Sequence, residues 1–433
     1  MNKRIAMISM HTCPLAYEEG KETGGMNIYV MSLAQELVKQ GYTIDIYTRL
    51  QSLKHKKIVS VTKQLRIIHI AAGPRHIAKK KLIHFVDEFA KNVALFIQEN
   101  KLSYDLFHAH YYLSGLAALK LQQSYDTPLP LVINFHTLAI MKNLVARSEL
   151  EQEDEHRVKA EIMLSRKADL LIAPSVADKE YLQYLYGAPE EKIAVINPGV
   201  DTDIFYPLPQ KIAREHIKAD INHKIILFVG RIEPLKGIDT LLYSLKILLE
   251  KEHSNICLFI VGGDISQKEK QWSQELQKLN ELRQLLGITT EVNFVGQKSQ
   301  HELAYYYNAA DVVVMPSHYE SFGMAALEAI ACGTHVITTN VAGIATLIDK
   351  PHQKFITTAN NPLLLAEQIN KLLAHTDNHG AMQQQLTQGI KNFTWENVAK
   401  KVAAAYERLM LNCHCEEPQR PQSRLTRRGN LPK

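Results

Sequence analysis

The sequence predicts an α/β protein with two doubly wound domains, each a parallel sheet covered by helices on both faces. Short apolar runs alternate with helical stretches along most of the chain. This alternation stops at a proline-rich segment near residue 200 and then begins again. The 433 residues also exceed what one hydrophobic core comfortably accommodates. Two successive blocks of this kind are typical of two parallel-sheet domains.

The first block contains seven runs rich in Ile, Val, Leu and Phe that we expect to be strands. They cover residues 5–10, 43–47, 67–70, 106–109, 131–135, 170–173 and 193–196. Continuous apolar runs suit strands that are buried on both faces, so they indicate a parallel sheet. The clearest helix covers residues 26–40, where Met26, Val30, Leu33 and Leu37 share one face and Gly41 ends the pattern.

Prolines and turn residues between positions 197 and 209 mark the predicted domain boundary. We expect a first domain at residues 1–200 and a second at 201–394, with strands at 224–229, 256–261, 292–295, 312–315 and 335–338. A last helix at about 395–412 is expected to pack back on the first domain, and residues 413–433 are predicted to be a disordered tail. Because ligands bind at the carboxyl ends of parallel strands, the cleft between the domains is the expected site.

Composition and charge exclude several classes of protein. With 46% hydrophobic and 22% charged residues, the chain is typical of globular proteins. The net charge of +5 includes +3 from residues 413–433, which leaves +2 for the remainder and argues against a nucleic-acid partner. No apolar run reaches the roughly 20 residues that span a bilayer. The run at residues 5–10 is too short for a signal peptide, so we expect a cytoplasmic protein.

Cysteine usage predicts neither a disulfide framework nor a metal site. The five cysteines are an odd number spread over a long chain. Cys413-His414-Cys415 lacks CxxC spacing and a second pair of ligands. We therefore expect no metal and no cofactor.

Two glycines, Gly24 and Gly25, precede the helix predicted at residues 26–40. Glycines at a helix N-terminus let backbone N–H groups approach an anion, and the helix dipole favours a phosphate there. The dinucleotide fingerprint GxGxxG is absent, which argues against an NAD enzyme. Taken alone, the glycine pair is explained equally well by a plain turn.

Arg231 and Lys236 follow the first strand expected in the second domain. Two cations at one strand end suit a diphosphate, and arginine offers bidentate hydrogen bonds. Solvated surface charges are the alternative interpretation of this segment.

Glu320 and Glu328 follow the apolar run at residues 312–315. Glu320 falls in a loop, and Glu328 falls about one and a half turns into a helix that begins at Gly323. Carboxylates accept hydrogen bonds from sugar and ribose hydroxyls, so the pair predicts a sugar-binding pocket. The alternative is a structural acid that caps a loop.

His108, His110 and His136 accompany two neighbouring apolar runs, and we expect them to reach the cleft. A packed, hydrogen-bonding histidine is the alternative at such positions. Metal binding is disfavoured because no acidic cluster accompanies them.

Together these elements resemble the retaining GT-B glycosyltransferases of family 4. The resemblance rests on the Glu320/Glu328 element, the Arg231/Lys236 pair and the Gly24-Gly25 turn. The N-terminal half adds His11-Thr12, Pro14-Leu15, Gly24-Gly25-Met26-Asn27-Ile28-Tyr29-Val30, His108-Ala109-His110-Tyr111, Leu113-Ser114-Gly115 and His136-Thr137-Leu138-Ala139. These segments are similar to the branch of D-inositol-3-phosphate N-acetylglucosaminyltransferase and sucrose-phosphate synthase, over roughly residues 1–410.

The resemblance implies a role for each matching residue. A nucleotide-sugar donor would contact Gly24, Gly25, Arg231, Lys236, Glu320, Phe322, Gly323, Met324 and Glu328. Within this set, Gly25, Arg231 and Lys236 would hold the diphosphate and Glu328 the ribose. His136, Arg231, Lys236 and Glu320 would be the catalytic residues. A phosphorylated acceptor would contact His11, Asn27, Lys80, Tyr111, Thr137 and Arg157, with a one-residue shift at Lys80 left open.

The reaction implied moves a hexosyl or N-acetylhexosaminyl group from a nucleotide sugar, which we expect to be a UDP-sugar. The acceptor would be a small phosphorylated polyol or sugar, such as inositol phosphate or fructose phosphate. Arg75-His76 and residues 294–297 depart from that branch, which leaves the donor sugar and the acceptor open. Arg157 has an alternative too, because it could pair with Glu153, Asp154 or Glu161 on its own helix.

Two other functions remain as alternatives. A membrane-surface glycosyltransferase with a phospholipid or lipid-linked acceptor would use Lys54, Lys56, Lys57 and the three lysines at 79–81. We favour solvated surface for these lysines, so membrane association is the less favoured interpretation. A non-catalytic GT-B binding module is disfavoured because His136, Arg231, Lys236 and Glu320 are all present.

Overall fold

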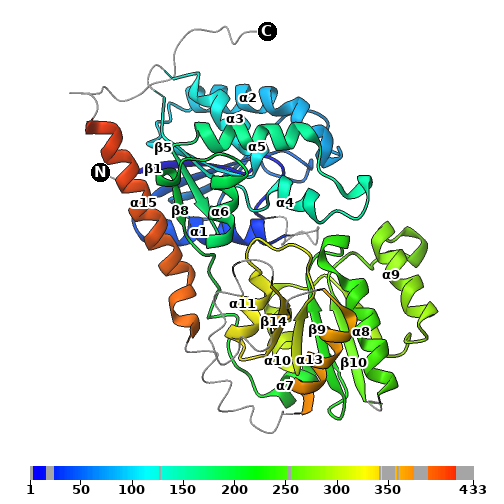
Figure 1. Ribbon diagram of the computed structural model, residues 1–433. Coiled ribbons are helices and arrows are strands. Elements are labelled where there is room, and N and C mark those ends of the chain that lie inside the picture. The colour runs from blue at the N-terminus through cyan, green and yellow to red at the C-terminus, as the bar shows by residue number, and fades with distance from the viewer. Residues whose placement is uncertain are drawn as a thin grey trace.

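The computed structural model describes residues 3–15, 24–125, 128–251, 255–340, 343, 356–357, 360–374 and 389–415 (Figure 1). Within these residues the chain forms two α/β domains, one around an eight-stranded sheet and one around a six-stranded sheet. The predicted fold class is confirmed. No helix among the described residues is both long and apolar enough to cross a bilayer.

The first domain contains a sheet with the strand order β3-β4-β2-β1-β5-β6-β7-β8. Its strands are β1 (Arg4–Ile8), β2 (Thr43–Arg49), β3 (Ile58–Ser60), β4 (Leu65–Ile70), β5 (Leu106–His110), β6 (Leu131–Asn134), β7 (Leu170–Ala173) and β8 (Ile193–Val195). All neighbours pair in parallel except β3 and β4, which are antiparallel. The order reverses between β1 and β5, which is where sheets of this type bind ligands.

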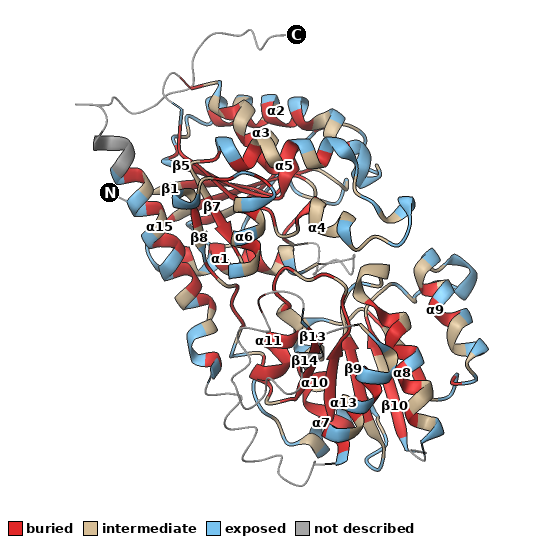
Figure 2. Ribbon diagram, in the orientation of Figure 1, coloured by how far each residue is buried: buried red, intermediate tan, exposed pale blue. Residues whose placement is uncertain are grey.

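Helices cover both faces of this sheet, and its central strands are buried (Figure 2). Ile5 and Met7 of β1 share an apolar cluster with α1 (Gly25–Lys39). Ala6 and Ile8 share the opposite cluster with α2 (Val86–Glu99), α3 (Tyr112–Gln122) and α5 (Glu155–Lys167). Successive side chains of a strand point to opposite faces, which explains why β1 is apolar throughout. The remaining helices here are α4 (Ala139–Leu144) and α6 (Val176–Tyr184), and the 3-10 turn η2 covers Lys79–Phe85.

The second domain has the strand order β11-β10-β9-β12-β13-β14, with every neighbouring pair parallel. The strands are β9 (Lys224–Val229), β10 (Ile256–Val261), β11 (Val292–Gly296), β12 (Val312–Met315), β13 (Val336–Thr339) and β14 (Ile356–Thr357). The helices are α7 (Gln210–Ile217), α8 (Ile238–Glu250), α9 (Gln274–Leu285), α10 (Gln300–Ala309), α11 (Met324–Ala331) and α13 (Pro362–Ala374). The order reverses between β9 and β12, so the loops after these two strands meet at the ligand-binding position.

The last helix, α15 (Trp395–Cys415), runs from the second domain back along the first (Figure 1). Its Val398, Val402 and Tyr406 are buried in the same apolar cluster as α1. The helix continues to Cys415, so a disordered tail beginning at residue 413 is wrong for its first three residues. Local helical periodicity continues through Cys413-His414-Cys415, because none of these residues breaks a helix. Residues 416–433 lie outside the described residues.

The two chain segments that connect the domains lie side by side. Val200 N donates a hydrogen bond to Phe393 O at 2.7 Å. A Cβ atom on Gly199 would lie only 2.7 Å from Trp395 N, so the close approach of the two backbones requires glycine. This crossing fixes the start of α15 against the segment that enters the second domain.

Candidate active site

The loops after β9 and β12 bring charged side chains of the second domain together. Lys236 lies in the 3-10 turn Pro234–Lys236, and its ammonium forms an ion pair with Glu320 in the loop after β12. Arg231, with 44% of its side chain exposed, pairs with Glu233 at 2.7 Å. The predicted pair of cations therefore stands at one sheet edge, each paired with a carboxylate, and Arg231 is the more exposed of the two.

Helix α11 places the second glutamate of the site. Gly323 precedes the helix with a φ of 91°, a conformation that favours glycine, and Phe322 before it is buried. Glu328 is buried and accepts a hydrogen bond from Tyr307 Oη at 2.7 Å. Burial raises the pKa of Glu328 to about 7, against the opposing effect of that hydrogen bond. Such a shift is what loss of solvent produces in a buried carboxyl group.

The glycine turn at the start of α1 contacts the second domain. Gly24 is the N-cap residue of α1, and no side chain caps the helix there. A Cβ atom on Gly25 would lie 3.1 Å from Met324 Sδ, and one on Gly24 would lie 3.9 Å from Arg231 Cδ. The N-terminus of α1, which no described side chain caps, thus faces the cationic loop of the other domain, an arrangement suited to an anion between them.

Two residues that follow strands of the first domain have unusual backbone conformations. Tyr111 follows β5 with a φ of 78°, and His136 follows β6 with a φ of 63°. Such values are uncommon for residues other than glycine and are typical of functional sites. Burial, with a smaller effect of His108, lowers the pKa of His136 to about 3, so its imidazole is neutral.

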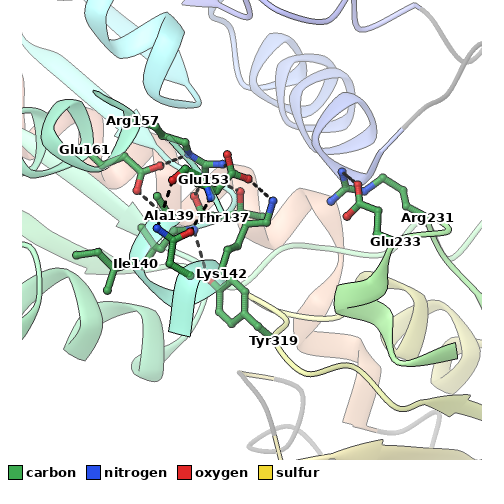
Figure 3. A network of polar contacts seen from close by, with 12 residues as sticks. Thr137, Ala139, Ile140, Lys142, Glu153, Arg157, Glu161, Arg231, Glu233 and Tyr319 are labelled. Carbon is green, nitrogen blue, oxygen red and sulfur yellow. Dashed lines mark hydrogen bonds and ion pairs between the residues drawn. The ribbon is translucent and has the colours of Figure 1, made fainter. Parts of the chain in front are cut away.

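Arg157 on α5 is the centre of a polar cluster in the first domain (Figure 3). Its guanidinium forms ion pairs with Glu153 at 2.9 Å and with Glu161 at 2.7 Å. It also donates to the backbone oxygen of Thr137 at 2.9 Å and to Thr137 Oγ1 at 3.1 Å. Arg157 does pair with acids near it in sequence, as the alternative interpretation proposed. It also orients the Thr137 hydroxyl, whose hydrogen stays available to a ligand.

Lys79, rather than Lys80, lies at this cluster. Lys79 Nζ lies 4.2 Å from the centre of the Tyr111 ring, and the Arg157 guanidinium lies 4.8 Å from the same ring. Desolvation, followed by the positive charges of Arg157 and Arg231, lowers the pKa of Lys79 to about 7, although the residue as a whole is exposed. Within the described residues Lys79 forms no ion pair. Lys80 is exposed, and the geometry favours the one-residue shift.

His11 and Asn27 lie beside this cluster in different ways. The ring of His11 lies 4.4 Å from that of Tyr111, and His11 Nδ1 is a buried atom without a hydrogen-bond partner in the described part of the chain. Asn27 is buried, accepts from Thr12 Oγ1 at 2.9 Å and donates to Cys13 O at 3.1 Å. Asn27 therefore stabilises the loop after β1, whereas His11 Nδ1 has no hydrogen-bond partner among the described residues.

The two domains touch across the site. Leu138 N donates to Tyr319 Oη at 3.3 Å, and Arg147 forms an ion pair with Asp239 at 2.5 Å. Figure 3 shows the Arg157 cluster on the first domain and the Arg231–Glu233 pair on the second. Across the described residues no group of three His, Cys, Asp or Glu is placed to hold a metal ion.

The alternative interpretation of Arg157 named Glu153 and Glu161, which lie four residues before and after it, and helical spacing was the signal for both. Sequence reasoning missed another polar partner in this site. Tyr307, which donates to Glu328, gave no such signal because it lies on another helix.

Comparisons with known proteins show similarity over nearly the whole chain. Residues 23–204 match the family described as Glycosyltransferase Family 4, and residues 210–392 match the family described as Glycosyl transferases group 1. The D-inositol 3-phosphate glycosyltransferase of Corynebacterium efficiens is 32% identical over 408 residues, which cover 93% of this chain and 95% of the relative. The chain belongs to glycosyltransferase family 4.

Further similarities extend over nearly the whole glycosyltransferase. The D-inositol 3-phosphate glycosyltransferase of Corynebacterium urealyticum is 34% identical over 411 residues, covering 94% of this chain and 96% of the relative. The structure of sucrose-phosphate synthase from Thermosynechococcus elongatus is similar, with a TM-score of 0.83 and 29% identity. That similarity covers 95% of this chain and 100% of the other. The predicted resemblance and the GT-B fold are confirmed.

Proposed function

We propose that this glycosyltransferase transfers a hexosyl or N-acetylhexosaminyl group from a UDP-sugar to a small phosphorylated polyol or sugar, with retention of configuration. The observation that carries the proposal is the position of Lys79. Its ammonium lies beside Tyr111, near two other cations, and forms no ion pair among the described residues. The two arginines have carboxylate partners, whereas Lys79 has none among the described residues, so an anion bound to Lys79 would stabilise its charge beside theirs.

Four residues from separate elements supply the proposed phosphate site. Lys79 comes from η2, Tyr111 and Thr137 from loops after β5 and β6, and Arg157 from α5. Lysine, phenol and hydroxyl donors can surround phosphate oxygens, and Arg157 adds charge. The names of the relatives support this reading, because D-inositol 3-phosphate and sucrose phosphate each carry a phosphate on a small polyol or sugar.

The cations of the second domain are proposed to stabilise the leaving group. Arg231, Lys236 and the N-terminus of α1 would offset the negative charge that develops on the donor diphosphate. In this mechanism the leaving phosphate oxygen takes the proton of the attacking hydroxyl on the same face of the sugar. The protein then contributes positioning and charge stabilisation.

The carboxylates are better suited to binding than to nucleophilic attack. Glu320 is paired with Lys236, and Glu328 accepts a hydrogen bond from Tyr307. A two-step retaining glycosidase instead uses a pair of carboxyl groups that flank the scissile bond. We propose that Glu320 contacts the donor sugar and Glu328 the ribose.

The test is a screen of UDP-, GDP- and ADP-sugars with inositol phosphate and fructose phosphate. We expect transfer with a UDP-sugar and a phosphorylated acceptor, and NMR of the product should show the anomeric configuration of the donor. Inversion of configuration, or activity only with a lipid-linked acceptor in vesicles, contradicts the proposal. The cytoplasmic location and the lack of nucleic-acid partners stay predictions.

A further inference from the structure

Two more histidines lie directly behind His136, buried where no substrate reaches them. His108 and His110 are fully buried on β5, with ring centres 4.2 Å apart. His110 Nδ1 lies 3.1 Å from His136 Nε2, so His110 contacts the proposed catalytic histidine directly. Within the described residues, no carboxylate hydrogen bonds to any of these three rings. Their hydrogens must therefore be placed by the neutral groups around them.

One backbone carbonyl group shows which ring nitrogen of His108 carries the hydrogen. Asn134 Nδ2 lies 3.3 Å from Ile172 O, which can only accept, so this contact identifies the amide nitrogen of Asn134. Asn134 Oδ1 then accepts from His108 Nε2 at 2.7 Å. Tyr406 Oη must donate to His108 Nδ1, at 2.5 Å. A neutral His108 satisfies both contacts, and burial lowers its pKa to about 4.

The contact between His110 and His136 allows two arrangements. If His136 Nε2 donates, neutral His110 must carry its own hydrogen on Nε2, which is buried without a partner. If His110 Nδ1 donates instead, buried His110 Nε2 carries no hydrogen, and only its lone pair is left without a partner. An orphaned buried N–H group is rarer in proteins than an under-satisfied acceptor, so the second arrangement is favoured.

We infer that His110 is a positioning residue that holds neutral His136 as the Nδ1–H tautomer. His136 Nδ1 has no hydrogen-bond partner in the described part of the chain and is not among the buried unpaired atoms. Its N–H group can therefore donate to an oxygen of the donor sugar. That last step rests on the proposed function, whereas the tautomer is a property of the protein alone.

The groups that face the pair do not disturb this tautomer. Tyr29 packs edge-on against both rings, at 5.9 Å from His110 and 5.1 Å from His136. Burial keeps the pKa of the Tyr29 phenol above its ordinary value and that of His11 below its ordinary value. All of these groups are neutral between pH 6 and 9, so the arrangement should persist across that range.

The direct test is long-range ¹H–¹⁵N NMR of protein labelled with ¹⁵N-histidine, without substrate. A His136→Gln variant identifies the signals of His136. We expect a protonated Nδ1 and an unprotonated Nε2 from pH 6 to 9. A protonated Nε2 on His136, or a doubly protonated ring, overturns the inference. Because no turnover is involved, this result is separate from any failure of the proposed donor or acceptor.

Two substitutions of similar size test the consequence for catalysis. The Nδ2 amide of His110→Asn can replace the Nδ1–H donor, whereas His110→Leu cannot. One oriented hydrogen bond corresponds to about a tenfold change in rate, so we expect His110→Leu to lower kcat about tenfold with the KM for the nucleotide sugar nearly unchanged. The kcat of His110→Asn should be close to that of the wild-type enzyme, and its NMR spectrum should still show a protonated His136 Nδ1. Equal rates in the two folded variants contradict the inference, and if the leucine variant fails to fold, the wild-type spectrum decides.

Discussion

Lys79 and Lys80 are adjacent in the sequence but differ in their surroundings. Lys79 lies over Tyr111 and forms no ion pair among the described residues, so its removal should leave the fold intact. A charge-assisted hydrogen bond contributes about 1.5–3 kcal/mol, so Lys79→Met should raise the KM of a phosphorylated acceptor about tenfold to a hundredfold. Lys80→Met is the matched control and should change it little. Normal kinetics in Lys79→Met with impairment in Lys80→Met would contradict this assignment.

The same lysine predicts a pH dependence. The pKa of Lys79 is lowered to about 7, so its amine loses the positive charge as the pH rises through that value. A phosphate monoester is mostly a dianion above its second pKa of about 6. We therefore expect kcat/KM for the acceptor to be highest between these values and to fall on the alkaline side. When kcat/KM is measured from pH 6 to 9, the alkaline fall should disappear in Lys79→Met. An identical fall in the variant would show that deprotonation of Lys79 does not cause it.

Among single residues, the sequence could predict the location of those that directly follow a strand. Arg231 and His136 follow apolar runs, and the carboxyl ends of such strands meet at one edge of the sheet. The choice between Lys79 and Lys80 stayed open in the sequence because both belong to a 3-10 turn within a run of three lysines, where no periodicity fixes the register.

Among the elements, α5 carries the ion pairs that hold the Arg157 cluster together. Glu161 is fully buried, so Arg157→Ala leaves its charge without compensation. We expect this change to lower the free energy of unfolding by about 3–5 kcal/mol in urea titrations. Lys159→Ala removes an exposed ion pair from the same helix and should barely change stability. Equal stability of the two variants would show that the buried pair contributes nothing.

The crossing of the two connecting segments makes a separate prediction. A Cβ atom on Gly199 would meet backbone atoms of Trp395 at 2.7 and 2.9 Å, which cannot move as a flexible side chain can. Gly199→Ala should therefore cost about 1–3 kcal/mol, as overpacking does elsewhere. Gly389→Ala is the control, because a Cβ atom there meets no atom of the described residues within 4 Å. Thermal unfolding of the two variants measures the difference, and an unchanged midpoint for Gly199→Ala would rule out the close approach.

Elements were predictable where burial imposes a pattern. Central strands such as β1 and β9 coincide with apolar runs because both of their faces are covered. The edge strand β3 was missed because it has three residues, two of them exposed, and carries no such run. Pairing with β4, rather than composition, makes it a strand.

At the scale of the whole molecule, the site exists only where the two domains meet. Tyr319 and Arg147 form hydrogen bonds and ion pairs across the domains, and the charge of Arg231 acts on His11 and Lys79. The sequence could predict two domains, the family and the facing strand ends. It could not predict which side chains touch across the domains, because those contacts depend on the relative orientation of two separately folded sheets.

The measurement that tests this account most directly compares one acceptor with and without its phosphate. In the wild-type enzyme, kcat/KM for the phosphorylated acceptor should exceed that for the dephosphorylated analogue by at least about a hundredfold, as loss of two charge-assisted contacts implies. In Lys79→Met, which loses one of these contacts, the ratio should fall about tenfold or more. Equal use of both acceptors by the wild-type enzyme would contradict the phosphate site, and with it the proposed reaction.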